Sequence, residues 1–246
     1  MNKILAVGAA CLVLAFATGC ARGVPGAQGG QQTLPTAAEP STQYFPVKFE
    51  HTAAYHDSEA QLQDDIDVAV YVVNQYWIDH WSDYFPGRYE PPTVAGGYEG
   101  THGPTCDGEP AEPMNAYYCI SEDYLAWDME LMRTYYENGG NDVFPYVVIA
   151  HEWGHAIAHR LDPSYSEEAP ELQADCLAGL ALYGAVSDGT LELEEGDGNE
   201  MARTYSLLGD DIPWADPSTH GDAVDRMTAF GAGRSGNIAA CIPLHS

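Results

Sequence analysis

The stretch VVIAHEWGHAIAHRL, residues 147–161, carries two histidines four residues apart within an apolar run. On an α-helix, residues i and i+4 lie on one face about a turn apart, so His151 and His155 can direct their rings at one point. Glu152 lies about 100° round the helix from His151, where it can act on a water molecule at that point without being a ligand. The spacing therefore predicts a helix that supplies two metal ligands and a neighbouring base.

A third ligand is needed, and there are two candidates. His159 continues the i+4 series, but three successive turns spread the side chains along about 12 Å of helix, which is too far for one ion. We expect His159 to be a partly exposed polar residue instead. Glu171 is the stronger candidate, because a carboxylate from a second, antiparallel helix completes a zinc site of two histidines and one glutamate. Such a site leaves one position open, as catalytic zinc requires.

Asp175 lies one turn beyond Glu171 in the stretch ELQADCLAGL, on the same face of the expected helix. We expect its carboxylate to accept the free ring N–H of a ligating histidine and so to fix the orientation of that ring. The alternative is that both carboxylates are solvated on a surface helix. The residues around them are mostly apolar, which predicts a buried helix, and two buried carboxylates need a cation.

The N-terminus is typical of an export signal. Residues 1–19 hold one basic residue, Lys3, then an uncharged apolar run and small residues ahead of Cys20. The run is too short for a comfortable membrane span. Its end resembles a bacterial lipoprotein signal, in which Cys20 becomes the lipidated first residue of the mature chain, although Ala17 stands where leucine is usual. Ordinary signal cleavage is the alternative.

Residues 20–43 are rich in Gly, Pro, Gln and Thr, so we expect a flexible tether. Residues 44–246 should form a single folded domain of about 200 residues. A lipid on Cys20 would hold this domain at the outer face of the membrane as a cell-envelope lipoprotein, although one lipid chain is a modest anchor. Without the lipid the protein would be secreted.

Export also decides how the cysteines are interpreted, because disulfides persist in oxidising compartments. Once the signal is removed and Cys20 is lipidated, four cysteines remain, and they allow three pairings. We favour the local pair Cys106–Cys119 and the long-range pair Cys176–Cys241. Buried free thiols are the alternative, and a four-cysteine zinc site is disfavoured because there is no CxxC pair.

The charge of the chain excludes one class of partner. The formal net charge is −28, from 37 Asp and Glu against 9 Lys and Arg. Such a surface repels phosphate backbones, so we do not expect a nucleic-acid partner.

Apolar spacings of three and four predict an amphipathic helix over residues 58–84. The Pro- and Gly-rich residues 85–113 should be irregular, and AYYCI (116–120) and DYLAW (123–127) should form two short strands. Further helices are expected near residues 129–138, 143–160, 167–186 and 199–208. The expected fold class is α+β, mainly helical with a small β-sheet.

Four stretches, YVVIAHEWGHAIAHRL, ELQADCLAG, MARTYSLLGDD and STHGDAVDRMTAFGAG, together with the four cysteines, give the chain a family resemblance over roughly residues 44–241. The sequence resembles the bacterial neutral zinc metallopeptidases, which are exported or membrane-anchored proteins with a zincin-like fold. The first two motifs are specific when they occur in this order, and the last two are weaker. Trp153 departs from the family pattern, in which small or aliphatic residues are commoner.

The resemblance implies a zinc peptidase that acts on a peptide or protein. In zincins the edge strand before the active-site helix binds extended substrate, and the DYLAW strand is positioned to do so. Glu152 would take a proton from the attacking water and pass it to the leaving amine.

A further donor should stabilise the oxyanion. His220 is the first candidate and Arg226 the second, although we expect Arg226 to pair with Asp222 or Asp225 instead. Two alternatives to a peptidase remain. One is an envelope binding or scaffold protein that retains zinc structurally, and the other is an amidohydrolase with non-peptide substrates.

Overall fold

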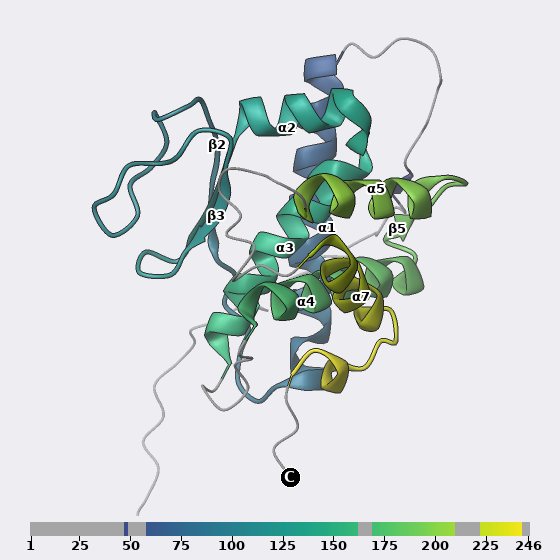
Figure 1. Ribbon diagram of the computed structural model, residues 1–246. Helices are drawn as coiled ribbons and strands as arrows, with labels where there is room; N and C mark the ends of the chain where they lie inside the picture. Colours follow the sequence, from purple (N-terminus) through teal and green to yellow (C-terminus); the bar gives the residue numbers. More distant parts are fainter. Residues whose placement is uncertain (1–46, 49–57, 162–168, 210–221, 243–246) are drawn as a thin grey trace, which may run out of the picture. The chain divides into compact units, whose positions relative to one another are not determined.

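The computed structural model describes residues 47–48, 58–161, 169–209 and 222–242, all within the unit Gln43–Ser246 (Figure 1). The expected signal, the lipidated Cys20, the tether and the candidate His220 lie outside the described residues. No helix in the described ranges has both the length and the apolar character needed to cross a membrane.

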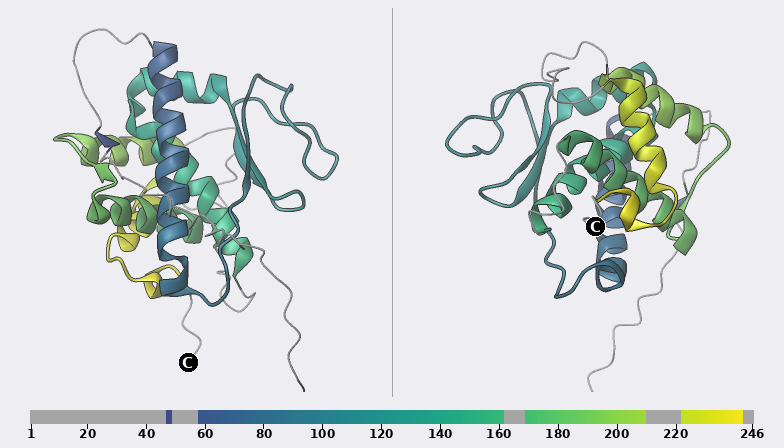
Figure 2. Two further views of the ribbon diagram at one scale, coloured as in Figure 1. Left: turned by 180° about the vertical axis from the view of Figure 1, so that it is seen from behind. Right: turned by 60° about the horizontal axis from the view of Figure 1, so that its bottom comes forward.

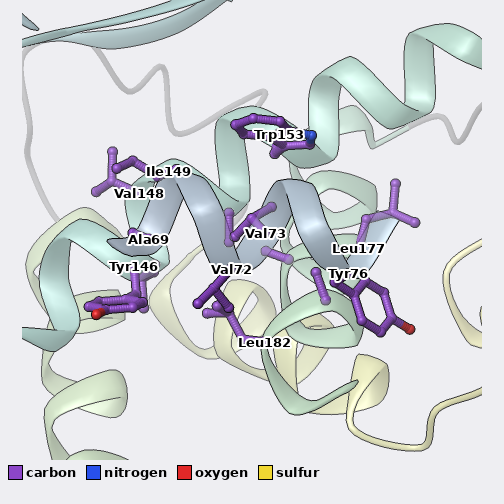
Figure 3. Packing of buried hydrophobic residues seen from close by; sticks show 14 of the residues in the cluster. Ala69, Val72, Val73, Tyr76, Tyr146, Val148, Ile149, Trp153, Leu177 and Leu182 are labelled. Carbon is purple, nitrogen blue, oxygen red and sulfur yellow. The ribbon is translucent and has the colours of Figure 1, made fainter. Parts of the chain in front are cut away.

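Helix α1 (Ser58–Tyr84) occupies the span expected from its apolar spacing. It packs against two central helices, α3 (Val143–Arg160) and α4 (Pro170–Asp188), and lies in front of them when the structure is seen from behind (Figure 2). Figure 3 shows the apolar core at this junction, where side chains of the three helices interleave. They include Val72, Val73 and Tyr76 of α1, Ile149 and Trp153 of α3, and Leu177 and Leu182 of α4.

The two central helices approach each other backbone to backbone. A Cβ added at Gly154 on α3 would collide with the backbone of Ala174 on α4. Only glycine therefore fits at this position, which lies between the two histidines of the motif. Helix α3 has the expected bounds, and α4 begins at Pro170, whose fixed φ suits the first turn of a helix.

Helix α5 (Asp197–Gly209) corresponds to the helix expected near residues 199–208. Helix α7 (Ala223–Gly233) is not among the expected helices. It begins at Asp222, whose carboxylate accepts hydrogen bonds of 2.9 Å from the backbone N–H groups of Val224 and Asp225. Asp222 is therefore a helix cap. A short 3₁₀-helix, Ile238–Ala240, follows.

Helix α7 is fixed against α4 by close backbone contact. A Cβ added at Gly179 on α4 would collide with the carbonyl oxygen of Phe230, and one added at Gly233 on α7 would collide with that of Cys176. Cys176 also forms a disulfide with Cys241, which follows α7 in the chain. Two glycines and one covalent bond thus fix the position of α7.

The sheet has three strands, β2 (Thr93–Tyr98), β3 (Ala116–Cys119) and β4 (Tyr124–Asp128), in the order β2-β4-β3. Strand β4 pairs in parallel with β2 and antiparallel with β3.

Two expectations about the sheet are therefore wrong. Residues 85–113 are not wholly irregular, because they contain β2, and the DYLAW stretch is not an edge strand, because β4 lies in the centre of the sheet. The edge strand that contacts α3 is β3.

Helix α2 (Met129–Tyr135) begins directly after β4. Asp128 joins the two elements, because its carboxylate accepts hydrogen bonds from the backbone N–H groups of Glu130 at 2.9 Å and of Met114 at 2.7 Å. The α-helix expected over residues 129–138 gives way to a π-helical turn at Tyr136–Gly140. Elsewhere in the fold, β1 (Val47–Lys48) and β5 (Leu191–Glu192) form a parallel two-stranded pair.

Both disulfides of the favoured pairing are present, which confirms that expectation. Cys106–Cys119 joins the loop after β2 to strand β3. Cys176–Cys241 joins α4 to the segment after α7, and it starts at the residue next to Asp175.

Candidate metal centre

Three side chains from two helices meet at one point. Nε2 of His151 lies 3.1 Å from Nε2 of His155, one turn further along α3. The same Nε2 atom lies 3.1 Å from Oε2 of Glu171 on α4, and Nε2 of His155 lies 3.4 Å from Oε1 of Glu171. Within the described residues this is the one grouping of its kind, and it could hold a metal ion.

The hydrogen-bonding pattern of His151 shows why these residues suit a cation. Oδ1 of Asp175 lies 2.8 Å from Nδ1 of His151, and a carboxylate oxygen accepts, so the ring proton belongs on Nδ1. In the neutral ring Nε2 then carries a lone pair, which faces the carboxylate of Glu171. Two acceptors at 3.1 Å need a positive charge between or on them, which a bound metal ion or a proton on Nε2 can supply.

The electrostatics of the buried carboxylates lead to the same conclusion. Burial opposes a charge on His151, but the Asp175 carboxylate outweighs it and raises the pKa of His151 to about 10. Burial also favours neutral Glu171, yet the two histidines hold the pKa of this carboxyl far below its usual range. His151 and Arg226 likewise lower the pKa of Asp175. Glu171 and Asp175 are thus ionised at neutral pH, and the centre takes up positive charge, as a proton or as a metal ion.

Glu152 lies beside this group without belonging to it. Its side chain is buried, with 7% of the residue exposed, and its carboxylate has no hydrogen-bond partner among the described residues. Burial raises the pKa of Glu152, partly offset by His151 and His155. A buried carboxylate with a raised pKa beside a possible metal site is suited to accepting and releasing a proton.

A cavity of about 560 Å³ lies over the centre. One face of α3 forms a wall of this cavity, since the lining residues recur at spacings of three and four. Strand β3 lines another part, and α2, α4 and α5 contribute Leu131, Pro170 and Leu208. The lining residues of α3 are Val148, His151, Glu152, His155, Ala158 and His159.

His159 and Trp153 are not in the ligand group. His159 is exposed, and its ring centre lies 6.0 Å from that of Tyr118 at the edge of the cavity. Trp153 is buried on another side of α3, where its Nε1–H donates to the hydroxyl of Tyr89 at 2.8 Å. The unusual tryptophan in the motif is therefore compatible with the ligand group.

Arg226 lies where the sequence did not predict it. Instead of pairing with Asp222 or Asp225, it donates from Nε and Nη2 to the two carboxylate oxygens of Asp175, at 2.8 and 3.0 Å. Its Nη2 lies 3.2 Å from Nδ1 of His151, because both nitrogens donate to the same oxygen. The sequence did hold one sign that Arg226 faces the interior. On a helix it shares one face with Phe230 and Gly233, at i, i+4 and i+7, and all three are buried on α7.

No protein-family model, curated protein or solved structure matches this chain. Two imidazole nitrogens and one carboxylate oxygen are a donor set that suits zinc and related transition metals.

Proposed function

We propose that this protein is a zinc-dependent peptidase with a zincin-like active site, similar to the neutral zinc metallopeptidases that its motifs resemble. The observation that carries the proposal is the position of Glu152. It is buried, it lacks a hydrogen-bond partner among the described residues, and it lies beside three side chains that could share one metal ion. A structural metal site has no need of such a group, whereas a hydrolytic site requires a base.

The residues of the chain divide the work of the proposed reaction. Zinc, when bound by His151, His155 and Glu171, would polarise the scissile carbonyl and make water more acidic. Glu152 would accept a proton from the attacking water and deliver it to the leaving amine. Asp175 would keep the proton of His151 on Nδ1, so that Nε2 stays available as a ligand.

The shape of the cavity supports an extended peptide as the substrate. From Val148 to His159 the lining face of α3 runs about 16 Å at 1.5 Å per residue, the length of about five residues in a β-strand. Strand β3 borders the same cavity and is an edge of its sheet, so it can offer backbone groups to a substrate strand. The apolar side chains of Leu131, Val148 and Leu208 would favour apolar substrate residues at one end.

We further propose that the protein works outside the cytoplasm, anchored through Cys20 or secreted. The signal-like residues 1–19 support export, and two disulfides fit an oxidising compartment. Mass spectrometry of membrane-extracted protein should find lipid on Cys20. A soluble mature chain that begins elsewhere and has no lipid mass would contradict the anchor, but not the peptidase.

The peptidase proposal is tested on the mature full-length chain with a mixture of peptides, read by mass spectrometry. Cleavage should occur, should stop when a chelator removes the metal, and should return when zinc is added back. A fully zinc-loaded protein that cleaves none of a diverse peptide library would favour a binding or scaffold role. Cleavage that persists without metal would exclude a metallopeptidase.

A further inference from the structure

We propose that Arg226 is a positioning residue of the metal centre: it holds the carboxylate of Asp175 in the orientation that directs His151 towards the ligand group. The inference rests on the metal-binding part of the proposed function and does not depend on peptide cleavage. It connects three helices in series, from Arg226 on α7 through Asp175 on α4 to His151 on α3.

The contact between Arg226 and Asp175 fixes the carboxylate in two directions. Nε donates to Oδ2 at 2.8 Å and Nη2 donates to Oδ1 at 3.0 Å, which is the two-point geometry of a guanidinium on a carboxylate. Oδ1 is the same atom that accepts the Nδ1–H of His151 at 2.8 Å. A carboxylate held at both oxygens cannot rotate away from the ring, whereas one held by His151 alone could.

The pair is also shielded from water. Asp175 is 0% exposed and Arg226 is 4% exposed, so neither charge can be satisfied by solvent. The guanidinium carbon of Arg226 lies 5.7 Å from the ring centre of Tyr205, which packs against it. Without the arginine, the buried carboxylate would have to turn, draw in water or become protonated, and each of these changes its contact with His151.

A purely structural role for Arg226 in attaching α7 is a weaker explanation. The close backbone contacts at Gly179 and Gly233 and the disulfide Cys176–Cys241 already fix α7 on α4. Arg226 extends from this fixed helix to the Asp175 carboxylate next to a metal ligand. Its geometry therefore indicates a local effect on the centre.

Electrostatics alone would predict the opposite sign for a mutation. Removing a positive charge from the neighbourhood of His151 should strengthen the binding of a divalent cation. Loss of positioning should weaken it. The direction of the change in zinc affinity therefore decides between the two effects.

The test measures zinc affinity of the full-length chain by competition with a chelator, without any peptide. Arg226→Gln should weaken zinc binding about 10- to 100-fold, the usual scale for losing a group that orients a ligand. Arg226→Lys, which keeps the charge but donates at one point, should fall between Arg226→Gln and wild type. Arg234→Gln is the matched control, since Arg234 packs over Tyr183, away from the centre. The zinc affinity of this variant should equal that of wild type.

A double-mutant cycle tests whether Arg226 acts through Asp175. In an Asp175→Asn background, Arg226→Gln should change zinc affinity by less than about 2-fold, because the intermediate carboxylate is already lost. The absorption spectrum of the cobalt-substituted protein should shift in Arg226→Gln and stay unchanged in Arg234→Gln, since it reports ligand geometry. This spectroscopic change would not follow from a general loss of stability.

Unchanged or tighter zinc binding in Arg226→Gln would overturn the inference, and so would losses that simply add in the double variant. If Arg226→Gln does not fold, Arg226→Lys tests the inference instead. It should bind zinc more weakly than wild type and should show a shifted cobalt spectrum. Wild-type protein that binds no zinc would contradict the proposed function itself. Tight wild-type binding with insensitive Arg226 variants would contradict this inference alone.

Discussion

Asp175 contacts His151 through the ring nitrogen that faces away from the ligand group, with Oδ1 2.8 Å from Nδ1. This contact separates two kinds of carboxylate on α4. Glu171 faces the point where a metal ion would lie, whereas Asp175 accepts a hydrogen bond from the opposite nitrogen of the His151 ring. The two therefore have different expected effects when mutated.

Glu171→Ala should lose most of the bound zinc, because two histidines alone leave the ion without its third protein ligand. Asp175→Ala should keep the site but weaken zinc affinity by about 10- to 100-fold. Metal analysis after dialysis against a weak chelator measures both. If His159→Ala lowers zinc content more than Glu171→Ala does, the ligand assignment is wrong.

Gly154→Ala should destabilise the protein, because the added Cβ would collide with the backbone of Ala174 and force α3 away from α4. Overpacking of this kind costs about 1–3 kcal/mol. Zinc affinity should fall as well, since Glu171 reaches the histidines from α4. Gly231→Ala is the control: nothing lies within 4 Å of its Cβ, so an exposed helical alanine should stabilise by about 0.5–1 kcal/mol. Urea unfolding of metal-free protein that ranks the two variants in the reverse order would refute the close contact.

The two disulfides should differ in their effect on the metal centre. Replacing both members of Cys176–Cys241 by serine opens a loop of 65 residues and should cost about 4 kcal/mol in the chain-entropy model. It should also weaken zinc binding, because this bridge helps to hold α7 and hence Arg226. The corresponding change at Cys106–Cys119, with a separation of 13, should cost about 3 kcal/mol and leave zinc affinity unchanged. Equal losses of zinc affinity in both variants would contradict a specific link from the Cys176–Cys241 bridge to the centre.

His80 predicts a pH dependence of stability away from the centre. Its Nε2 lies 2.8 Å from Asp188 and its Nδ1 lies 3.1 Å from Asp83. Burial lowers its pKa, but Asp188 and Asp83 outweigh this and raise it above its usual value. A raised folded pKa stabilises the protein fully below the unfolded pKa of about 6.5, and this contribution disappears as pH rises through the folded value.

Wild type should therefore be more stable than His80→Gln at pH 5.5, by about 0.5 kcal/mol as for other partly exposed ion pairs. The difference should be smaller at pH 9, where more of His80 is neutral. Denaturant titrations of the two proteins at both pH values measure it, and their difference cancels the other titrating groups. Asp188→Asn should remove most of the pH dependence too. A difference of the same size at both pH values would assign the effect to packing.

Local sequence patterns predicted the parts of the fold that are themselves local. The bounds of α1 and α3 follow from continuous apolar spacing, and the ligand group follows from i and i+4 pairs on two helices. Strand β2 was not predicted, because its sequence, TVAGGY, holds two adjacent glycines and is mostly exposed. Helix α7 was not predicted either, because it is short and carries glycines at 231 and 233, which have low helix propensity.

The remaining errors concern contacts between distant parts of the chain. A strand sequence does not determine whether it lies at the centre or the edge of a sheet, so the buried DYLAW strand was placed at the edge. Arg226 is 51 residues from Asp175, and its nearer acidic neighbours were the more plausible partners on sequence grounds. Only the packing of α7 on α4 brings the two together.

The proposed role of Glu152 as the base of a zinc peptidase is tested most directly by Glu152→Gln. Glutamine keeps the size and shape of the side chain but cannot accept the proton. Because Glu152 is not in the ligand group, zinc content and folding should stay near wild type, while peptide cleavage should fall at least about 10²-fold. Unchanged cleavage by a zinc-loaded Glu152→Gln protein would contradict the account, and loss of its zinc would show that Glu152 is a ligand.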